Sequence, residues 1–130
     1  MAENEHILIA GGGRVGRRVA RRFADRGREV TVIERETDSV DADGGFSVVE
    51  GDATRPPVLQ EALRDDTGTI AALTDREDTN LAVCMIARQL DPDLRTIARI
   101  EDECGDEFAD FVDQVYFPER ASIKAAVNAI

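Results

Sequence analysis

The stretch HILIAGGGRVGRRVA, residues 6–20, joins an apolar run to a glycine-rich turn and then to an arginine-rich segment. The apolar run predicts a strand over His6–Ala10, and the apolar spacing that follows predicts a helix over Val15–Arg26. The glycines between them fit the pattern Gly11-x-Gly13-x-x-Gly16. A turn of this pattern between a strand and a helix indicates a site for the phosphates of a nucleotide.

Each glycine of this turn has its own expected role. Gly11 permits the tight turn, Gly13 lets the backbone approach a pyrophosphate, and Gly16 lets the helix pack closely on the strand. The first N–H groups of the helix lack partners within it, and the positive end of the helix dipole lies there. We therefore expect phosphate groups to lie against this turn.

The rest of the chain alternates strands and helices, as expected of a single domain of 130 residues. This alternation predicts an α/β fold, the doubly wound Rossmann fold, with a six-stranded parallel sheet and helices on both faces. Its domain spans residues 1–130 and ends within the helix after the sixth strand. Further strands are expected at Val30–Glu34, Phe46–Glu50, Thr69–Leu73, Thr96–Ile100 and Gln114–Phe117, and further helices at Thr37–Ala42, Pro56–Arg64, Glu77–Leu90, Cys104–Phe111 and Pro118–Ile130.

An acidic residue ends the second predicted strand. Glu34 lies 23 residues after Gly11, and a carboxylate there can accept hydrogen bonds from both ribose hydroxyls and would repel a 2′-phosphate. Arg35 works in the opposite direction, because a guanidinium at the next position can hold a 2′-phosphate. Arg14, inside the glycine pattern, could fold over the phosphates and make a bidentate contact. The alternative for Glu34 is a solvated strand end.

Polar residues also follow the later strands. Asp52 and Ala53 follow the third strand, Thr74 follows the fourth, and Arg99 ends the fifth. The carboxyl ends of parallel strands meet at one edge of a sheet, so these residues should converge on the same crevice. Asp75 has an alternative role as the N-cap of the helix that follows it.

Composition excludes several classes of partner. The chain has 27 acidic residues against 16 basic ones, and its net charge of −11 disfavours nucleic acid and anionic membranes as general partners. No apolar stretch is long enough to cross a membrane, and the acidic N-terminus is unlike a secretory signal, so we expect a cytoplasmic protein without direct membrane insertion. Cys84 and Cys104 match no metal-binding spacing.

Groups for catalysis are not placed near the predicted crevice. The only histidine, His6, begins the first strand, the only tyrosine lies in the last strand, and the only lysine lies in the terminal helix. No lysine follows the glycines, which excludes a P-loop enzyme. The acidic run from Glu101 to Glu107 favours a solvated face over a cation site. Binding without chemistry, and no metal, is therefore the expectation.

Several stretches together resemble the N-terminal nucleotide-binding domain of the TrkA and KTN/RCK family, which regulates potassium channels and transporters. GDAT after the third strand and TDxxDxN before the fourth helix are more diagnostic than the glycines. The similar stretches are ILIAGGGRVGRRVA (7–20), REVTVIER (28–35), VVEGDAT (48–54), AALTDREDTNLAVCMIARQL (71–90), TIARIED (96–102) and VDQVYFPER (112–120).

The resemblance implies a role for each candidate residue. The three glycines would hold the phosphates, Arg14 would reach the outer phosphate, and Glu34 would bind the adenosine ribose. Asp52 and Ala53 would border the adenine, with Thr74 and Arg99 lining the cleft. The full set expected to bind the cofactor, NAD(H) or ATP/ADP, is Gly11, Gly13, Arg14, Val15, Gly16, Glu34, Arg35, Asp52, Ala53, Thr74 and Arg99.

The function implied is nucleotide sensing by a homodimer or higher ring that controls potassium transport by a separate membrane channel or transporter subunit. The apolar residues around Leu81–Ile86 suit either such pairing or burial under the sheet. The chain would be a stand-alone subunit or part of a longer protein. Two alternatives remain open, namely a fragment of an NAD-dependent oxidoreductase and an interaction module that binds no nucleotide.

Overall fold

The computed structural model describes residues 5–36, 44–101, 110–116, 126–128 and 130. Within these residues the chain forms a six-stranded parallel sheet in the order β3-β2-β1-β4-β5-β6. The chain crosses over after β3, so that β4 lies on the other side of β1. The elements are β1 (His6–Ala10), α1 (Arg14–Asp25), β2 (Val30–Glu34), β3 (Ser47–Glu50), α2 (Pro56–Ala62), β4 (Thr67–Ala72), α3 (Glu77–Leu90), β5 (Arg95–Arg99) and β6 (Gln114–Tyr116).

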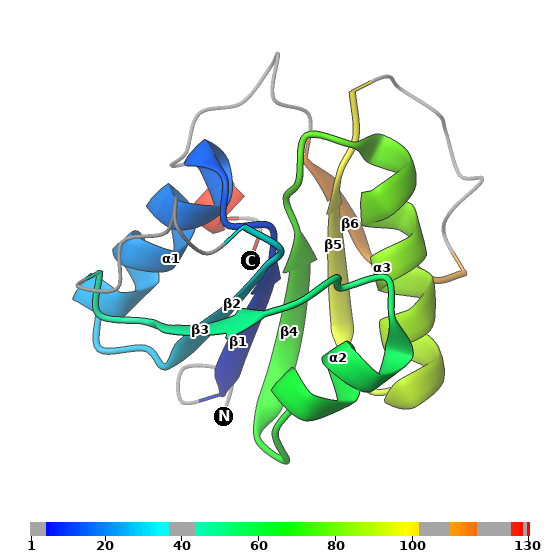
Figure 1. Cartoon of the computed structure of the whole chain (residues 1–130), viewed down its shortest axis with the longest axis horizontal. Coiled ribbons are helices and arrows are strands. Elements are labelled where there is room, and N and C mark those ends of the chain that lie inside the picture. Colours follow the sequence, from blue (N-terminus) through cyan, green and yellow to red (C-terminus); the bar gives the residue numbers. More distant parts are fainter. Residues whose placement is uncertain (1–4, 37–43, 102–109, 117–125, 129) are drawn as a thin grey trace.

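Helices cover both faces of the sheet. Figure 1 shows α1 on one side of the strands and α2 and α3 on the other. Alternate residues of β1 face the two sides, because successive side chains of a strand point in opposite directions. Ile7 and Ile9 pack in the core beneath α1 with Phe23, whereas Leu8 packs with Leu59 of α2 and Val83 of α3 in the second core. Burial on both faces explains why the central strands are continuously apolar.

The start of β1 contains a buried polar side chain. His6 is fully buried, and its two ring nitrogens each lie 2.7 Å from a threonine hydroxyl, Nδ1 from Thr67 and Nε2 from Thr31. Burial, and after it the positive charge of Arg64, lowers the pKa of His6. A neutral imidazole has one donor and one acceptor nitrogen, so two hydroxyl groups satisfy it in either tautomer.

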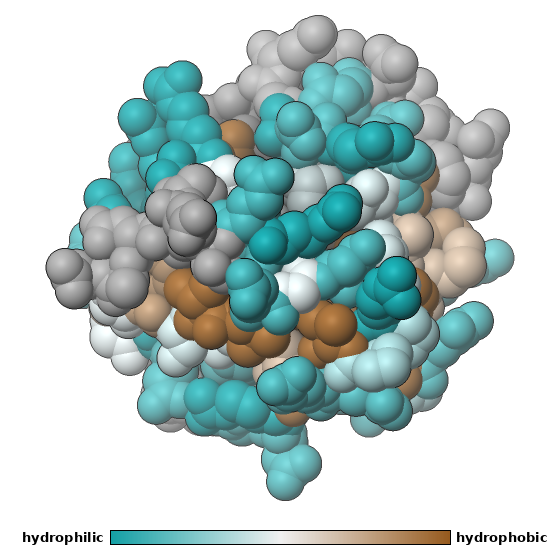
Figure 2. Space-filling view, viewed as in Figure 1, coloured by the Kyte–Doolittle hydropathy of each residue, from teal (hydrophilic) through white to brown (hydrophobic). Residues whose placement is uncertain are grey.

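The surface of the domain is mostly hydrophilic, as Figure 2 shows for one face. In that view the apolar surface gathers over β3 and α2. Val49 of β3 and Val58 of α2 are half-buried and pack against the core beneath α2 and α3. Among the described residues Met85 of α3 is the large apolar side chain that is most exposed, at 45%.

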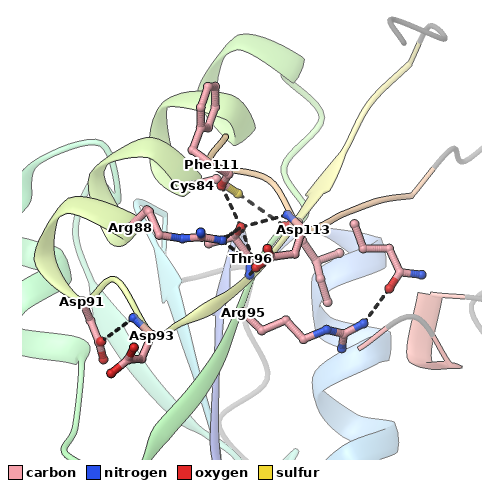
Figure 3. Close-up of polar contacts among 10 residues, drawn as sticks. Cys84, Arg88, Asp91, Asp93, Arg95, Thr96, Phe111 and Asp113 are labelled. Carbon is pink, nitrogen blue, oxygen red and sulfur yellow. Dashed lines mark hydrogen bonds and ion pairs between the residues drawn. The ribbon is translucent and has the colours of Figure 1, made fainter. Parts of the chain in front are cut away.

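A polar network joins β5 to the segment before β6 (Figure 3). The Thr96 N–H donates to Asp113 Oδ2 over 2.8 Å, and the Asp113 N–H donates to the Thr96 carbonyl over 2.9 Å. Arg88 of α3 completes the network with an ion pair of 2.6 Å to Asp113. Burial would raise the pKa of Asp113, but the hydrogen bonds from Thr96 and Arg88 outweigh it and lower the pKa.

The structure confirms the predicted fold class and moves several boundaries. β4 begins at Thr67 instead of Thr69, because its pairing with β1 extends to His6 across an irregularity in register. α2 ends at Ala62 instead of Arg64, because Leu63 has extended backbone angles. Other ends move by one or two residues. Of the predicted helices, 37–42 lies outside the described residues, Asp110 and Phe111 of 104–111 form a turn, and residues 126–128 of the last helix are helical.

Candidate functional site

The glycine turn between β1 and α1 lies at the carboxyl edge of the sheet. Gly11 has a φ of +109°, and a Cβ on it would lie 2.9 Å from Cγ2 of Thr74. A Cβ on Gly16 would lie 1.8 Å from the carbonyl oxygen of Gly11. Gly16 therefore packs against the turn itself, and the strand is farther away, with Ile9 Cγ2 at 3.5 Å. Both positions require glycine for steric reasons.

Gly13 differs from the other two glycines. It is exposed and is the N-cap of α1, with ordinary extended backbone angles, and a Cβ built on it would meet nothing within 4 Å. The packing of the described residues therefore gives no reason for glycine at this position. Close approach of another molecule to the backbone would explain why glycine stands at this position.

Glu34 turns back toward the glycine turn. Its Oε2 accepts a hydrogen bond of 2.5 Å from the N–H of Gly12, which fixes the carboxylate beside the turn. Its backbone carbonyl accepts from the N–H of Gly51 over 3.0 Å, so the same residue also joins β2 to the connection after β3. The half-buried Glu34 is thus held in place at both its main chain and its side chain.

The connection after β3 forms a compact turn around Asp52. The Asp52 carboxylate accepts two hydrogen bonds from Thr54, 2.6 Å from the hydroxyl and 2.9 Å from the N–H. These bonds lower the pKa of Asp52, and the charges of Arg35 and Arg55 lower it further. Asp52 is therefore ionised at neutral pH. Ala53 is only 8% exposed and packs in the core beneath α2 and α3.

Thr74 and Arg99 are joined by the last residue of the diagnostic stretch TDxxDxN, to which the sequence analysis gave no role of its own. The fully buried Asn80 of α3 accepts from the N–H of Thr74 over 3.0 Å, and its Nδ2 donates to the carbonyl of Arg99 over 2.9 Å. The prediction that Asp75 caps α3 is wrong, because the N-cap is Arg76 and it makes no side-chain capping bond. The asparagine in the stretch TDREDTN was the available signal.

The arginines around the turn have different environments. Arg14, the first residue of α1, is exposed, and its side chain makes no hydrogen bond or ion pair with the other described residues. The side chain of Arg99 is 18% exposed, and its Nη2 lies 3.5 Å from Glu101 Oε1. Val15, which follows Arg14 in α1, is half-buried and packs against the core beneath that helix. The exposed side chain of Arg14 is therefore available to fold over a group bound at the turn.

His6 and Cys84 lie away from the glycine turn. His6 begins β1 and so lies at the amino edge of the sheet, opposite the turn. Cys84 is buried in the middle of α3, and burial raises the pKa of its thiol to about 12. Within the described residues no three His, Cys, Asp or Glu side chains gather in a way that could hold a metal ion. No helix in the same part of the chain is long and apolar enough to span a membrane.

The sheet order, with a glycine turn after β1 and an acidic residue ending β2, defines a Rossmann-fold protein. The sequence model of the TrkA-N domain matches residues 7–118. The chain therefore belongs to the TrkA-N family, as its resemblance predicted.

Individual proteins support this assignment. The chain is 38% identical over 100 residues to a Trk system potassium uptake protein TrkA homolog of Pyrococcus abyssi, covering 75% of this chain and 44% of that protein. The chain thus spans less than half the length of this relative. Among solved structures it resembles the AMP-bound C-terminal domain of Kef from Shewanella denitrificans, with 28% identity, a TM-score of 0.66 and coverage of 75% of this chain and 60% of the other.

The GsuK channel is a second similar structure. Bound to NAD, it matches with 27% identity and a TM-score of 0.72 over 88% of this chain and 21% of that chain. Bound to ADP, it matches with 25% identity and a TM-score of 0.73 over 88% of this chain and 31% of the other. Proteins that share this fold at this identity thus hold adenine nucleotides of different lengths.

Proposed function

We propose that this chain is a nucleotide-binding domain that regulates potassium transport by a separate membrane protein. Its ligand is NAD(H) or ATP/ADP, bound at the carboxyl edge of the sheet against the glycine turn. The observation that carries the proposal is Gly13, because its surroundings leave space for a Cβ and yet the chain has none there. The nucleotides in the solved relatives AMP-bound Kef and NAD- and ADP-bound GsuK support this ligand class.

The residues around the turn fit a nucleotide. Backbone N–H groups at the start of α1 suit the phosphates, with Gly11 and Gly16 shaping the turn and Val15 anchoring its first helical residues. Arg14 is free to contact the outer phosphate. Asp52, Ala53 and Arg35 are proposed to border the adenine end of the ligand, and Thr74 and Arg99 to line the opposite side.

Glu34 is proposed to select the ribose. One of its oxygens accepts from the Gly12 N–H, but an ionised carboxylate has about four acceptor positions. The bond to Gly12 therefore orients Glu34 and leaves it able to accept from ribose hydroxyls. A carboxylate at this position disfavours a 2′-phosphate, so NAD should bind better than NADP.

Regulation would act through a shift between conformations. A ligand that binds one arrangement of a homodimer or ring better than another favours that arrangement by the difference in affinity. We propose such an assembly in the cytoplasm, formed by copies of the domain spanning residues 1–130 and associated with a membrane channel or transporter subunit. We propose no catalytic role, since the buried His6 begins β1, at the edge of the sheet opposite the turn.

The first test is a thermal-shift series on the purified chain with NAD, NADH, NADP, ATP and ADP. It is run at moderate and at high potassium chloride, because the net charge of −11 makes stability depend on salt. A ligand that binds the native state raises the melting temperature. We expect a rise with NAD or the adenine nucleotides and little with NADP. No rise with any of the five at either salt concentration would remove the proposed function.

The role of Arg14 is tested by Arg14→Ala. If its guanidinium contacts the outer phosphate, the variant should bring the affinities for ATP and ADP closer together. The matched control is Arg18→Ala, because Arg18 is also an exposed arginine and lies one turn farther along α1. An unchanged ratio in the Arg14 variant would show that another group distinguishes the two ligands.

A further inference from the structure

The buried side chain of Asn80 holds the tips of two strands. Its Oδ1 accepts from both the N–H and the hydroxyl of Thr74, at 3.0 and 2.6 Å. Its Nδ2 donates to the carbonyl of Thr74 at 3.0 Å and to the carbonyl of Arg99 at 2.9 Å. Both N–H bonds and the oxygen of one carboxamide are thus used, and the residue is fully buried.

The two residues that Asn80 joins follow β4 and end β5. Thr74 also lies directly against the glycine turn, since the Cβ position of Gly11 is 3.0 Å from the Thr74 backbone nitrogen. A second contact joins the same elements, because Glu77 in the first turn of α3 accepts from the N–H of Glu101 over 3.3 Å. The position of Thr74 beside Gly11 is therefore linked through α3 to the end of β5.

We propose that Asn80 is a positioning residue of the nucleotide site, setting the place of Thr74 against the glycine turn relative to the end of β5 at Arg99. This inference rests on the proposed nucleotide-binding function and adds a residue that does not itself line the site. The chemistry requires an amide. A carboxylate could accept the bonds from Thr74 but could not donate to the two carbonyls, and an apolar side chain could do neither.

The test compares Asn80→Asp, which has nearly the same shape and loses both N–H donors, with Val83→Ala. Val83 is also fully buried in α3 and packs in the core beneath that helix, so its truncation lowers stability without touching Thr74 or Arg99. NAD and ADP affinities of the wild type and both variants are measured by calorimetry at a temperature where each is fully folded. Amide resonances are recorded by NMR with and without ligand.

We expect Asn80→Asp to weaken NAD and ADP binding by about tenfold or more. The free energy lost when a buried hydrogen-bonding group is left without its partner corresponds to a factor of that size in affinity. Val83→Ala should bind within about twofold of the wild type. Ligand-induced shifts should persist at Gly11 and Gly13 in the Asp variant and diminish at Arg99 and Ile100. If Asn80→Asp does not fold, Asn80→Ser, which buries no charge and cannot reach both strands, is measured in the same way.

Three outcomes would overturn the inference, and they are distinguishable. Wild-type protein that binds neither NAD nor ADP would remove the proposed function and the positioning role with it. Wild-type binding, with equal affinity and an equal pattern of shifts in the Asn80 variant, would leave the proposed function in place and remove the positioning role alone. Equal losses in the Asn80 and Val83 variants would also overturn it, because stability would then explain the effect.

Discussion

Alanine at two glycines of the same turn should affect different properties: Gly16→Ala should lower stability, and Gly13→Ala should weaken ligand binding. In Gly16→Ala the new Cβ would lie 1.8 Å from the backbone oxygen of Gly11, and neither atom can rotate away. Overpacking against backbone of this kind costs about 3 kcal/mol. For a domain of 130 residues that corresponds to a fall in melting temperature of about 10 °C.

Gly13→Ala should leave the fold intact and abolish most of the ligand binding. Its Cβ meets nothing within 4 Å and its backbone angles suit any residue, so the change in stability should stay within about 1 kcal/mol. In the wild type, NAD at 100 times its dissociation constant adds about 2.7 kcal/mol to the free energy of unfolding. The Gly13 variant should lose most of that gain.

The assay is thermal unfolding followed by circular dichroism, with and without NAD or ADP, for the wild type and both variants. The reasoning about packing fails if Gly16→Ala melts at the wild-type temperature. The reasoning about the ligand fails if Gly13→Ala keeps the full ligand-dependent rise, because the bound phosphates would then not lie against this backbone.

Three further predictions concern residues outside the turn. Burial lowers the pKa of His6, so as the pH falls the unfolded chain takes up a proton near pH 6.5, before the folded chain does. The free energy of unfolding should therefore fall below that pH, by up to about 1.4 kcal/mol per pH unit. Urea titrations between pH 7.5 and 5.5 should show a smaller loss in His6→Gln than in the wild type. The variant Cys104→Ser keeps Cys84 as its sole thiol. A disulfide reagent at pH 8 should react with this variant only as the protein unfolds, because burial raises the pKa of Cys84 to about 12. Rapid labelling of the native protein would contradict the burial of Cys84. Asp113→Ala should lower the free energy of unfolding by about 1–3 kcal/mol, because the buried Thr96 N–H loses its carboxylate acceptor. Asp113→Asn keeps an acceptor oxygen and should lose less stability. Equal losses in the two variants would show that the charge of the carboxylate matters more than its hydrogen bond.

The sequence was sufficient for the six strands, for the helices α1, α2 and α3, and for the order in which they come. Continuous apolar strands and helical spacing are local signals, and the parallel alternation restricts the sheet to few arrangements. The turn at Gly11 was also predictable, since its pattern lies between a strand and a helix. The predicted contacts of the site residues with a nucleotide stay predictions, tested by the experiments above.

What the sequence could not supply were pairings between distant residues. His6 depends on hydroxyls 25 and 61 residues away, and Asp113 contacts an arginine 25 residues before it. Asn80 belongs to the stretch TDxxDxN that the resemblance marked as diagnostic, but its own role could not be predicted, because its partners Thr74 and Arg99 come together only when β4 and β5 lie side by side. The alternative role of Asp75 as a cap came from its local pattern, which does not show that α3 has Arg76 as its N-cap and no side-chain capping bond.

The backbone contact between Gly16 and Gly11 has a consequence for how such a domain can diverge. The shape of the turn depends on two glycines and on main-chain atoms, whereas Arg14 and Arg35 are exposed side chains that contribute little to packing. Substitutions at those two positions should therefore have little effect on folding, and under the proposed function they would change which ligand is bound. If the turn binds phosphates as proposed, a lineage could exchange one nucleotide for another by changing side chains at the tips of β2 and α1, while the two glycines of the turn stay under steric constraint.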